Sequence, residues 1–232
     1  MIYSVHIPIR GPQAYYAKAV QSLEAQTCKD FELIICEDNS NTKHVLKPIA
    51  TSFPQRIVQI TSRLPGWAYG VARNVCLDFA SRTSDYLVHC DVDWILRPVS
   101  LEKCKLGLSP DRIIQGYKYY VGPGRKRHQT RFFPELCIIP LDAAILCGGW
   151  DEIFFPWYAG DYHDLMRRLQ LIRKLELIKT KALFADDIGS SVEFDKVYDV
   201  GKQLVDKLKD MGTKQSIVRR TVPCKIVYEK GF

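Results

Sequence analysis

Two apolar runs in the first hundred residues are each followed by carboxylate side chains. Of the residues in this chain, these carboxylates are the best suited to bind a metal cation or to accept a hydrogen bond from an amide N–H. The run LIIC precedes EDNS at residues 37–40, and the run YLVHC precedes Asp91-Val92-Asp93. Side chains at i and i+2 of an extended segment point the same way, so Asp91 and Asp93 can converge on one hard cation. Each signal is weak alone, because Asp38 can form an Asx turn and a lone D-x-D is often a solvated loop.

A third acidic pair stands in GGWDEIFFPWYAGDYHDLMRRL, where a helical pattern begins. Asp161 followed by Asp164 resembles a capping box, in which Asp164 would pair with Arg167 or Arg168 one turn on. A second interpretation, compatible with the first, makes Asp161 a general base at the edge of a cleft. That cleft would be lined by aromatic residues suited to stacking on sugar rings: Trp150, Trp157 and Tyr158.

Alternating strand-like and helical patterns must position these groups. Strand patterns cover 3–9, 31–36, 56–61, 86–90, 112–121 and 136–139, and helical patterns cover 13–26, a segment ending near 52, 69–81, 99–106 and 161–175. The early alternation predicts an α/β fold built on a doubly wound, mainly parallel sheet flanked by helices. Ligands of such sheets bind outside the carboxyl ends of the strands, where these carboxylates follow the apolar runs.

Two segments carry an excess of basic residues. Residues 122–131, GPGRKRHQTR, predict a mobile basic loop that orders when a diphosphate binds. Beyond residue 185 a charged helix is expected near 196–211, followed by a strand-like run at 216–228.

Composition indicates one globular domain with a basic surface. The chain has 232 residues, of which 47% are hydrophobic and 25% charged, and Lys plus Arg exceed Asp plus Glu by 33 − 26 = 7. Such a surface attracts anions. The eight cysteines are scattered without a C-x-x-C pair, so we expect reduced structural thiols. No leader pattern or run of ~18 apolar residues occurs, which predicts a cytoplasmic protein and leaves peripheral contact with a membrane surface open.

Taken together and in this order, the motifs resemble family 2-type glycosyltransferases, which have the GT-A fold. SVHIPIR resembles the first strand and its proline-containing turn, SLEAQTCKDFELIICEDNS the next helix and strand, and GWAYGVARNVCLDFA the G-x-x-x-ARN helix. CDVD resembles the D-x-D motif, and GGWDE with DYHDLMRRL resembles the GG(F/W)DE and ED-x-D-L stretches. The resemblance runs from about residue 3 to about residue 170.

This resemblance implies one GT-A-type domain at residues 1–185, with a nucleotide-sugar-binding half at 1–97 and an acceptor-side half at 98–185. Residues 186–232, which match no motif of the family, are expected to form a helical and basic C-terminal extension to it.

The resemblance also implies roles at matching positions. On the donor side, Pro8 and Arg10 would contact the nucleotide-sugar, Asp38 the nucleobase, and Arg73 the base or diphosphate. Asp91 would hold the ribose and assist Asp93 in binding Mn²⁺ or Mg²⁺.

On the acceptor side, Asp161 falls on the first acid of the family's ED pair, where the catalytic base is sought. The second acid is replaced here by Tyr162, which leaves Asp164 as a substitute base.

The function that follows is metal-dependent transfer of a sugar from a nucleotide-sugar, UDP being the commonest nucleotide in the family, to an acceptor hydroxyl with inversion. The acceptor would be a carbohydrate, a lipid-linked molecule or a protein, and no nucleic acid is expected. Two alternatives remain open. A nucleotidyltransferase would carry a glycine- and basic-rich phosphate loop near its N-terminus, where residues 8–20 hold only Arg10 and Lys18. A non-catalytic binder of nucleic acid or membrane surfaces would explain the positive charge but not the acidic stretches.

Overall fold

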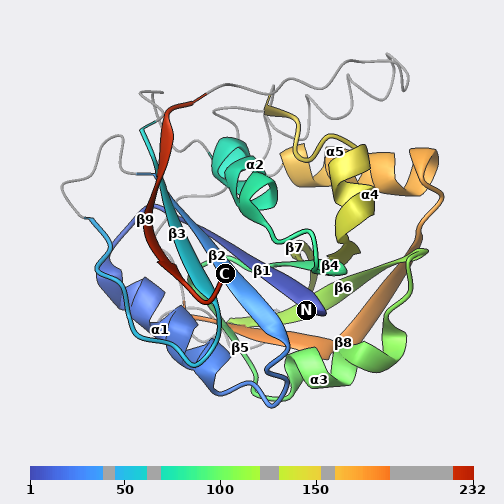
Figure 1. The fold of residues 1–232 in the computed structure, drawn as a ribbon. Coiled ribbons are helices and arrows are strands. Elements are labelled where there is room, and N and C mark those ends of the chain that lie inside the picture. Colours follow the sequence, from blue (N-terminus) through green and yellow to red (C-terminus); the bar gives the residue numbers. More distant parts are fainter. Residues whose placement is uncertain (39–44, 62–68, 121–130, 153–159, 189–221) are drawn as a thin grey trace.

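The computed structural model places most of the chain in one α/β unit (Figure 1). It describes residues 1–38, 45–61, 69–120, 131–152, 160–188 and 222–232. The basic segment 121–130, the residues Trp157 and Tyr158, and the helix expected near 196–211 lie outside the described residues.

The described residues form a nine-stranded sheet in the order β5-β8-β6-β7-β4-β1-β2-β3-β9. Its strands are β1 (Tyr3–Ile9), β2 (Phe31–Asp38), β3 (Gln55–Ile60), β4 (Tyr86–His89), β5 (Trp94–Leu96), β6 (Arg112–Tyr120), β7 (Arg131–Pro140), β8 (Glu176–Asp187) and β9 (Cys224–Lys230). Strands β5, β7 and β9 run antiparallel to their neighbours, and the others share one direction, so the sheet is mixed and mostly parallel.

Helices cover both faces of this sheet. They are α1 (Gln13–Glu24), α2 (Tyr69–Phe79), α3 (Ser100–Cys104) with the 3₁₀ turn η1 (Lys105–Gly107), α4 (Leu141–Leu146) and α5 (Gly160–Ile172). Figure 1 shows α2, α4 and α5 on one side of the sheet and α1 and α3 on the other. Within the described part of the chain, no helix is both long and apolar enough to span a membrane.

Burial on both faces explains why the central strands read as unbroken apolar runs. Every residue of β2 is buried. Leu33 and Ile35 pack into the core beside α1, whereas Ile34 and Cys36 pack beside α2. Successive side chains of a strand point to opposite faces, so a strand between two helical layers needs apolar residues at every position. The α/β fold with its doubly wound, mainly parallel sheet is therefore confirmed.

The helix expected to end near residue 52 is wrong for the part that is described. Residues 45–52 have no helical structure. They lie against the first helix and the sheet, because Glu37 Oε1 accepts the N–H of Leu46 at 2.7 Å and the hydroxyl of Tyr16 accepts the N–H of Ile49 at 3.1 Å. Pro48 within the segment also lacks the N–H that a helix needs.

Three strands were not predicted with these bounds. β5 has three residues and β8 carries exposed lysines at alternate positions, so neither has a continuous apolar signal. β9 lies within the basic C-terminal segment and pairs antiparallel with β3, so the end of the chain belongs to the same sheet. The division of the chain at residue 185 remains a prediction.

Candidate active site

Parallel pairing brings the predicted donor-side residues to one edge of the sheet. Strand β1 lies between β2 and β4, with Pro8 opposite Cys36 and His6 opposite His89. Pro8 and Asp38 are buried at this edge, and Arg10 is half-buried just beyond the end of β1. Asp91 and Asp93 follow β4 at the same edge.

The D-x-D segment forms a turn between β4 and β5 in which Asp91 is held by its neighbours. The carbonyl of Asp91 accepts the N–H of Trp94 at 3.0 Å. Burial, followed by the nearby Arg73 charge, lowers the pKa of His89 well below its usual range, so the imidazole is neutral at pH 7. We assign its proton to Nε2, which donates to Asp91 Oδ1 at 3.2 Å.

Asp93 comes two residues later in the same turn and is held through its main chain. Its carbonyl accepts the N–H of Ile188, at the end of β8, at 3.0 Å. Burial raises the pKa of the Cys90 thiol, and Asp93 raises it further while Lys118 lowers it, so both charged groups lie near the same sulfur. The backbone of the D-x-D turn is therefore fixed by strands from both halves of the sheet.

Arg73 on α2 connects this turn to α5. Its Nη1 donates to Asp161 Oδ2 at 2.5 Å, and its Nη2 lies 4.0 Å from Asp91 Oδ1. The guanidinium lies over the rings of Tyr69, at 3.8 Å, and Tyr162, at 4.4 Å. Three segments that are far apart in the sequence thus meet at one buried cation.

The structure corrects the local role expected for Asp161. Helix α5 begins at Gly160, so Asp161 lies inside the first turn and is not the N-cap residue. Its Oδ1 accepts the N–H of Tyr162 at 2.9 Å, and its Oδ2 binds Arg73. The main partner of Asp161 is therefore a distant arginine, and its other oxygen accepts from the next residue of its own helix.

Tyr162 occupies the position of the missing second acid with an aromatic ring. Its hydroxyl donates to the carbonyl of Glu135 at 3.3 Å and lies 3.6 Å from Cys137 Sγ. Burial raises the pKa of Tyr162 well above its usual range, so the phenol stays protonated and cannot act as a base at neutral pH. The ring instead supports the Arg73 guanidinium.

Asp164 is fully engaged in ion pairs one turn along the helix. Its Oδ1 accepts from Arg167 Nη2 at 3.1 Å and its Oδ2 from Arg168 Nε at 2.6 Å, which confirms the expected pairing. Arg168 also donates through Nη2 to the carbonyl of Gly149 at 2.7 Å and through Nη1 to the carbonyl of Cys147. The arrangement ties α5 to the loop after α4.

Asn74, next to Arg73 on α2, holds the same loop from the other side. Its Nδ2 donates to the carbonyl of Trp150 at 2.8 Å and to Glu152 Oε1 at 2.6 Å, while its Oδ1 accepts the N–H of Trp150 at 2.9 Å. A Cβ at Gly149, where φ is +73°, would come within 2.3 Å of Asn74 Oδ1, so only glycine fits there. Sequence reasoning missed this contact, although the ARN and GGWDE motifs contain both partners.

Trp150 does not line a cleft as expected. Its side chain is completely buried, with its ring centroid 5.8 Å from that of His89 and 6.0 Å from that of Tyr162. A ring enclosed in this way offers no face to a sugar. It supports the residues around Arg73 from within the core instead. Trp157 and Tyr158, the other two aromatic residues, lie outside the described residues.

A buried ion pair next to the D-x-D turn also escaped the sequence analysis. Lys118 Nζ lies 2.9 Å from Asp187 Oδ2 and 4.2 Å from the centroid of the Trp94 ring. The two charged residues come from β6 and β8 and the tryptophan from β5, and β8 had no strand signal in the sequence. No local pattern could have joined these residues.

The carboxylates at the D-x-D turn have the donor chemistry for a divalent cation whose remaining ligands are diphosphate oxygens and water. Among the residues that the structure describes, no three His, Cys, Asp or Glu side chains cluster as a complete metal site. Mg²⁺ in particular takes one or two carboxylates and completes its shell with phosphate oxygens and water, and Asp91 and Asp93 supply two oxygen donors of that kind.

Comparisons with known proteins give one family and one fold. A family model described as glycosyl transferase family 2 matches residues 4–186. The TarS fragment 1–349 from S. aureus superimposes with a TM-score of 0.64 at 13% identity, covering 93% of this chain and 67% of that chain. A mannosyltransferase from Pyrobaculum calidifontis, in complex with GDP-Man and Mn²⁺, superimposes with a TM-score of 0.61 at 13% identity, covering 92% and 65%.

The same TarS fragment, in complex with UDP-GlcNAc, superimposes with a TM-score of 0.63 at 15% identity, covering 93% and 68%. The chain thus spans about two thirds of the TarS fragment and of the mannosyltransferase, and 39% of a longer solved TarS chain, and at such identities the likeness shows the fold alone. A search of curated proteins found no match.

Proposed function

The chain belongs to glycosyl transferase family 2, and on that basis we propose that it transfers a sugar from a nucleotide-sugar to an acceptor hydroxyl. The observation that carries the proposal is the buried contact of Arg73 with Asp161, next to Asp91. It joins the ARN helix, the D-x-D turn and the helix after GGWDE into one polar cluster. Each of these was suggested by a separate motif.

The donor would lie across the carboxyl ends of β1, β2 and β4. In this proposal Pro8 and Arg10 contact the nucleotide-sugar, and Asp38 binds the nucleobase. UDP is the favoured nucleotide, and similar folds are known with UDP-GlcNAc and with GDP-Man.

Asp91 and Asp93 would hold Mn²⁺ or Mg²⁺ against the donor. Bound there, the ion would neutralise the charge that develops on the leaving diphosphate, which is worth several kcal/mol. Arg73 adds a second positive charge in a setting screened from water by Tyr69 and Tyr162. Its Nε is buried and has no hydrogen-bond partner among the described residues, so an oxygen of the donor can accept from it.

Asp161 would act as the general base. It would take the proton of the acceptor hydroxyl while that oxygen attacks the anomeric carbon from the face opposite the diphosphate, so the product is inverted. A positioned base of this kind contributes about 10²–10⁴ in rate. Asp164 is the weaker candidate, because both of its oxygens already accept from arginines.

The two alternative functions have less support. A nucleotidyltransferase would need a phosphate loop in the N-terminal segment, where α1 begins after Pro12 without an N-capping side chain. A basic binding protein would not need carboxylates buried around an arginine. The acceptor, whether carbohydrate, lipid-linked molecule or protein, would approach from residues 98–185.

The test is thermal unfolding with UDP, GDP or CDP, each with and without Mn²⁺, followed by hydrolysis assays on a panel of nucleotide-sugars. A nucleotide at about 100 times its dissociation constant should add about 2.7 kcal/mol of stability. We expect one nucleotide to stabilise the protein only with Mn²⁺ and its sugar conjugate to be hydrolysed slowly. The proposal fails if no nucleotide stabilises the protein under either condition.

A further inference from the structure

Three aliphatic side chains face solvent at the carboxyl ends of α4 and α5. Leu146 is 65% exposed at the end of α4, and Leu171 and Ile172, the last two residues of α5, are 59% and 52% exposed. Apolar residues earlier in α5, such as Leu165 and Leu169, are completely buried instead. A single exposed leucine needs no explanation, but a group of exposed aliphatic side chains marks a surface for contact with another molecule.

The two helix ends lie together. Figure 1 shows α4 and α5 next to each other on one side of the sheet, and Arg168 of α5 donates to the carbonyl of Cys147, the residue after Leu146. Burial raises the pKa of the Cys147 thiol, and the charges of Arg168 and then Arg173 lower it, so Arg173 also lies near the end of α4. We use the name α5 end surface for this group, which consists of Leu146, Leu171, Ile172, Arg173 and Lys174.

Cations are in excess around this surface. Residues 164–181 contain six Lys or Arg and two Asp or Glu. Asp164 pairs with two of these arginines, and Glu176 pairs with Arg112 at 3.1 Å. Asp111, whose carbonyl accepts the N–H of Glu176, adds one negative charge at this end. Within the described residues, the four other cations of the segment have no ion pair: Arg173, Lys174, Lys179 and Lys181. Their charge is available to an anionic partner.

Lys174 has a backbone conformation that glycine usually adopts. Its φ is +56°, a positive value that no other non-glycine residue has in the part of the chain that the structure describes. The next N–H, that of Leu175, donates to the carbonyl of Leu169 at 3.2 Å and turns the chain from α5 into β8. Glycine is favoured in a left-handed position after a helix because it has no Cβ, so lysine keeps a charge here at a cost in stability. Such a cost indicates a use for the charge.

Exposed aliphatic side chains next to cations without acidic partners favour the surface of an anionic bilayer. Aliphatic groups gain free energy when they leave water for the boundary between headgroups and acyl chains, and Lys and Arg are attracted by the negative headgroups. Each Lys or Arg close to such a bilayer strengthens binding by about fivefold. A nucleic acid would neutralise the cations through its phosphates but would leave the three aliphatic side chains in water.

We propose that the α5 end surface docks the protein on an anionic lipid bilayer. The three aliphatic side chains enter the headgroup layer, and Arg173 and Lys174 pair with lipid phosphates. Lys179 and Lys181 follow on β8 and add to the attraction. Asp161 lies in the first turn of the same helix, about 16 Å along its axis from Ile172, so the contact does not include the candidate active site.

Co-sedimentation of the full chain with lipid vesicles tests the proposal. One set of vesicles contains phosphatidylcholine alone, and the other contains equal parts of phosphatidylcholine and phosphatidylglycerol. We expect binding to the anionic vesicles to be at least about tenfold tighter. Raising the ionic strength to about 1 M, where the screening length falls to about 3 Å, should weaken that binding by about tenfold or more. Equal binding to both kinds of vesicle, or binding to neither, overturns the proposal.

Two variants at the α5 end surface separate docking from folding. Lys174→Gly removes a cation and relieves the left-handed backbone, so affinity for anionic vesicles should fall by about fivefold while the melting temperature is not lowered. Leu171→Ser removes an exposed aliphatic group and should also weaken binding by about fivefold or more at unchanged stability. Vesicle binding that is unchanged in both variants shows that these residues serve the fold alone, and it overturns the proposal.

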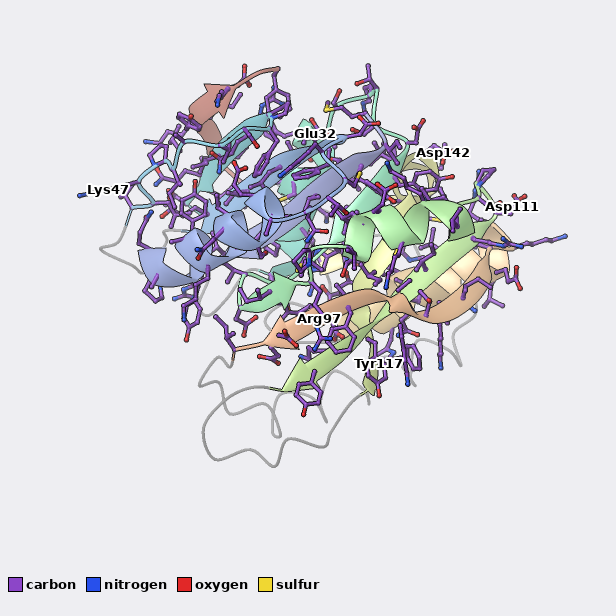
Figure 2. The ribbon with its side chains drawn as sticks, turned by 90° about the horizontal axis from the view of Figure 1, so that it is seen from below. Glu32, Lys47, Arg97, Asp111, Tyr117 and Asp142 are labelled. Carbon is purple, nitrogen blue, oxygen red and sulfur yellow. The ribbon has the colours of Figure 1, made fainter. Side chains whose placement is uncertain are left out.

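A matched pair of lysines controls for net charge. Lys179 and Lys47 are both exposed, and Figure 2 shows Lys47 at the opposite side of the molecule from Asp111, which lies beside the start of β8. Lys179→Gln should lower affinity for anionic vesicles by about fivefold. Lys47→Gln should leave it unchanged, because charges separated by more than about 10 Å are largely screened at 0.1 M salt. Equal losses in the two variants would reflect net charge alone and would overturn the assignment of the surface.

A single-stranded oligonucleotide distinguishes a bilayer from a nucleic acid as the partner. We expect the anionic vesicles to bind the protein and to lose affinity in Leu171→Ser. Binding of the oligonucleotide without binding of the vesicles overturns the proposal. None of these measurements requires a nucleotide-sugar, so docking on a bilayer is tested independently of the proposed glycosyl transfer.

Discussion

Two buried arginine–aspartate pairs meet α5 one helical turn apart, and they differ in how completely the arginine is used. Arg168 donates from all three of its nitrogens, to Asp164 and to two carbonyls of the loop after α4. Arg73 donates to Asp161 from one nitrogen, lies 4.0 Å from Asp91 through a second, and has a buried third nitrogen with no hydrogen-bond partner in the described structure. The residue types and the burial are the same.

The number of donors that already have a protein partner distinguishes an arginine that stabilises the fold from one that can bind a ligand. A guanidinium whose donors are all satisfied by the protein has nothing to offer a ligand and serves to hold elements together. A buried donor left without a partner is costly unless a ligand completes it, and such groups are expected where substrates bind. We name Arg73–Asp161 the site pair and Arg168–Asp164 the clamp pair.

The largest effect on turnover is expected from a change at Asp93, near the site pair. Asp93→Ala should lower transfer by about 10⁴ or more, because a lost metal ligand removes several kcal/mol of leaving-group stabilisation. Mn²⁺-dependent stabilisation by nucleotide should disappear, while stability without ligand changes little, because Asp93 lies in a turn beyond the end of β4. Turnover assays and thermal unfolding check both parts. Near-normal turnover would show that the D-x-D turn is not the metal site.

The clamp pair should matter for folding. Arg168→Met removes one partner of a buried ion pair and three donors, and we expect the free energy of unfolding to fall by about 3 kcal/mol, since Arg167 still pairs with Asp164. Urea denaturation measures this loss, and turnover per folded molecule should stay near normal. A large loss of turnover at unchanged stability would show that the clamp pair takes part in catalysis and does not mainly stabilise the fold.

A direct contrast compares the two carboxylates. Asp161→Asn should lower turnover by about 10² or more with nucleotide binding intact, because an amide cannot accept the acceptor proton at neutral pH. Asp164→Asn should cost less than about tenfold in turnover. Both variants weaken a hydrogen bond to a buried arginine, so both should lose about 1.5–3 kcal/mol of stability.

Activity, measured per folded molecule, therefore separates the two carboxylates, and the product's anomeric configuration checks inversion. An active Asp161→Asn with an inactive Asp164→Asn would assign the base to the clamp pair.

The smallest effect is expected at Tyr162, whose ring lies over Arg73 of the site pair. Tyr162→Phe keeps the ring over Arg73 but removes the hydroxyl that donates to the carbonyl of Glu135. One buried hydrogen bond is worth about 0.5–1.5 kcal/mol, and turnover should stay within a few-fold of normal. Denaturation and turnover assays measure the two effects. A loss of turnover near that of Asp161→Asn would show that the hydroxyl itself takes part in the reaction.

The sequence predicted those elements whose pattern is strong and local. The strands at 3–9 and 86–90 and the helix at 69–81 were found within about two residues, because each is a continuous apolar run or a clear helical period. β8 has no continuous apolar run, because only three of its twelve residues are fully buried. The segment 45–52 is not helical, because its backbone N–H groups donate to side chains of β2 and α1.

For the site, the sequence by itself determined which carboxylates follow the parallel strands, since strand order along the chain and the ends of apolar runs are local properties. Only the tertiary structure decided the partners. Arg73 and Asp161 are 88 residues apart, and Asn74 reaches a backbone carbonyl 76 residues away. The same packing enclosed Trp150 in the core, where the sequence had suggested an exposed ring. Which side chains pair depends on how the helices pack on the sheet. The hydrophobic periodicity of one segment carries no information about its distance from another segment.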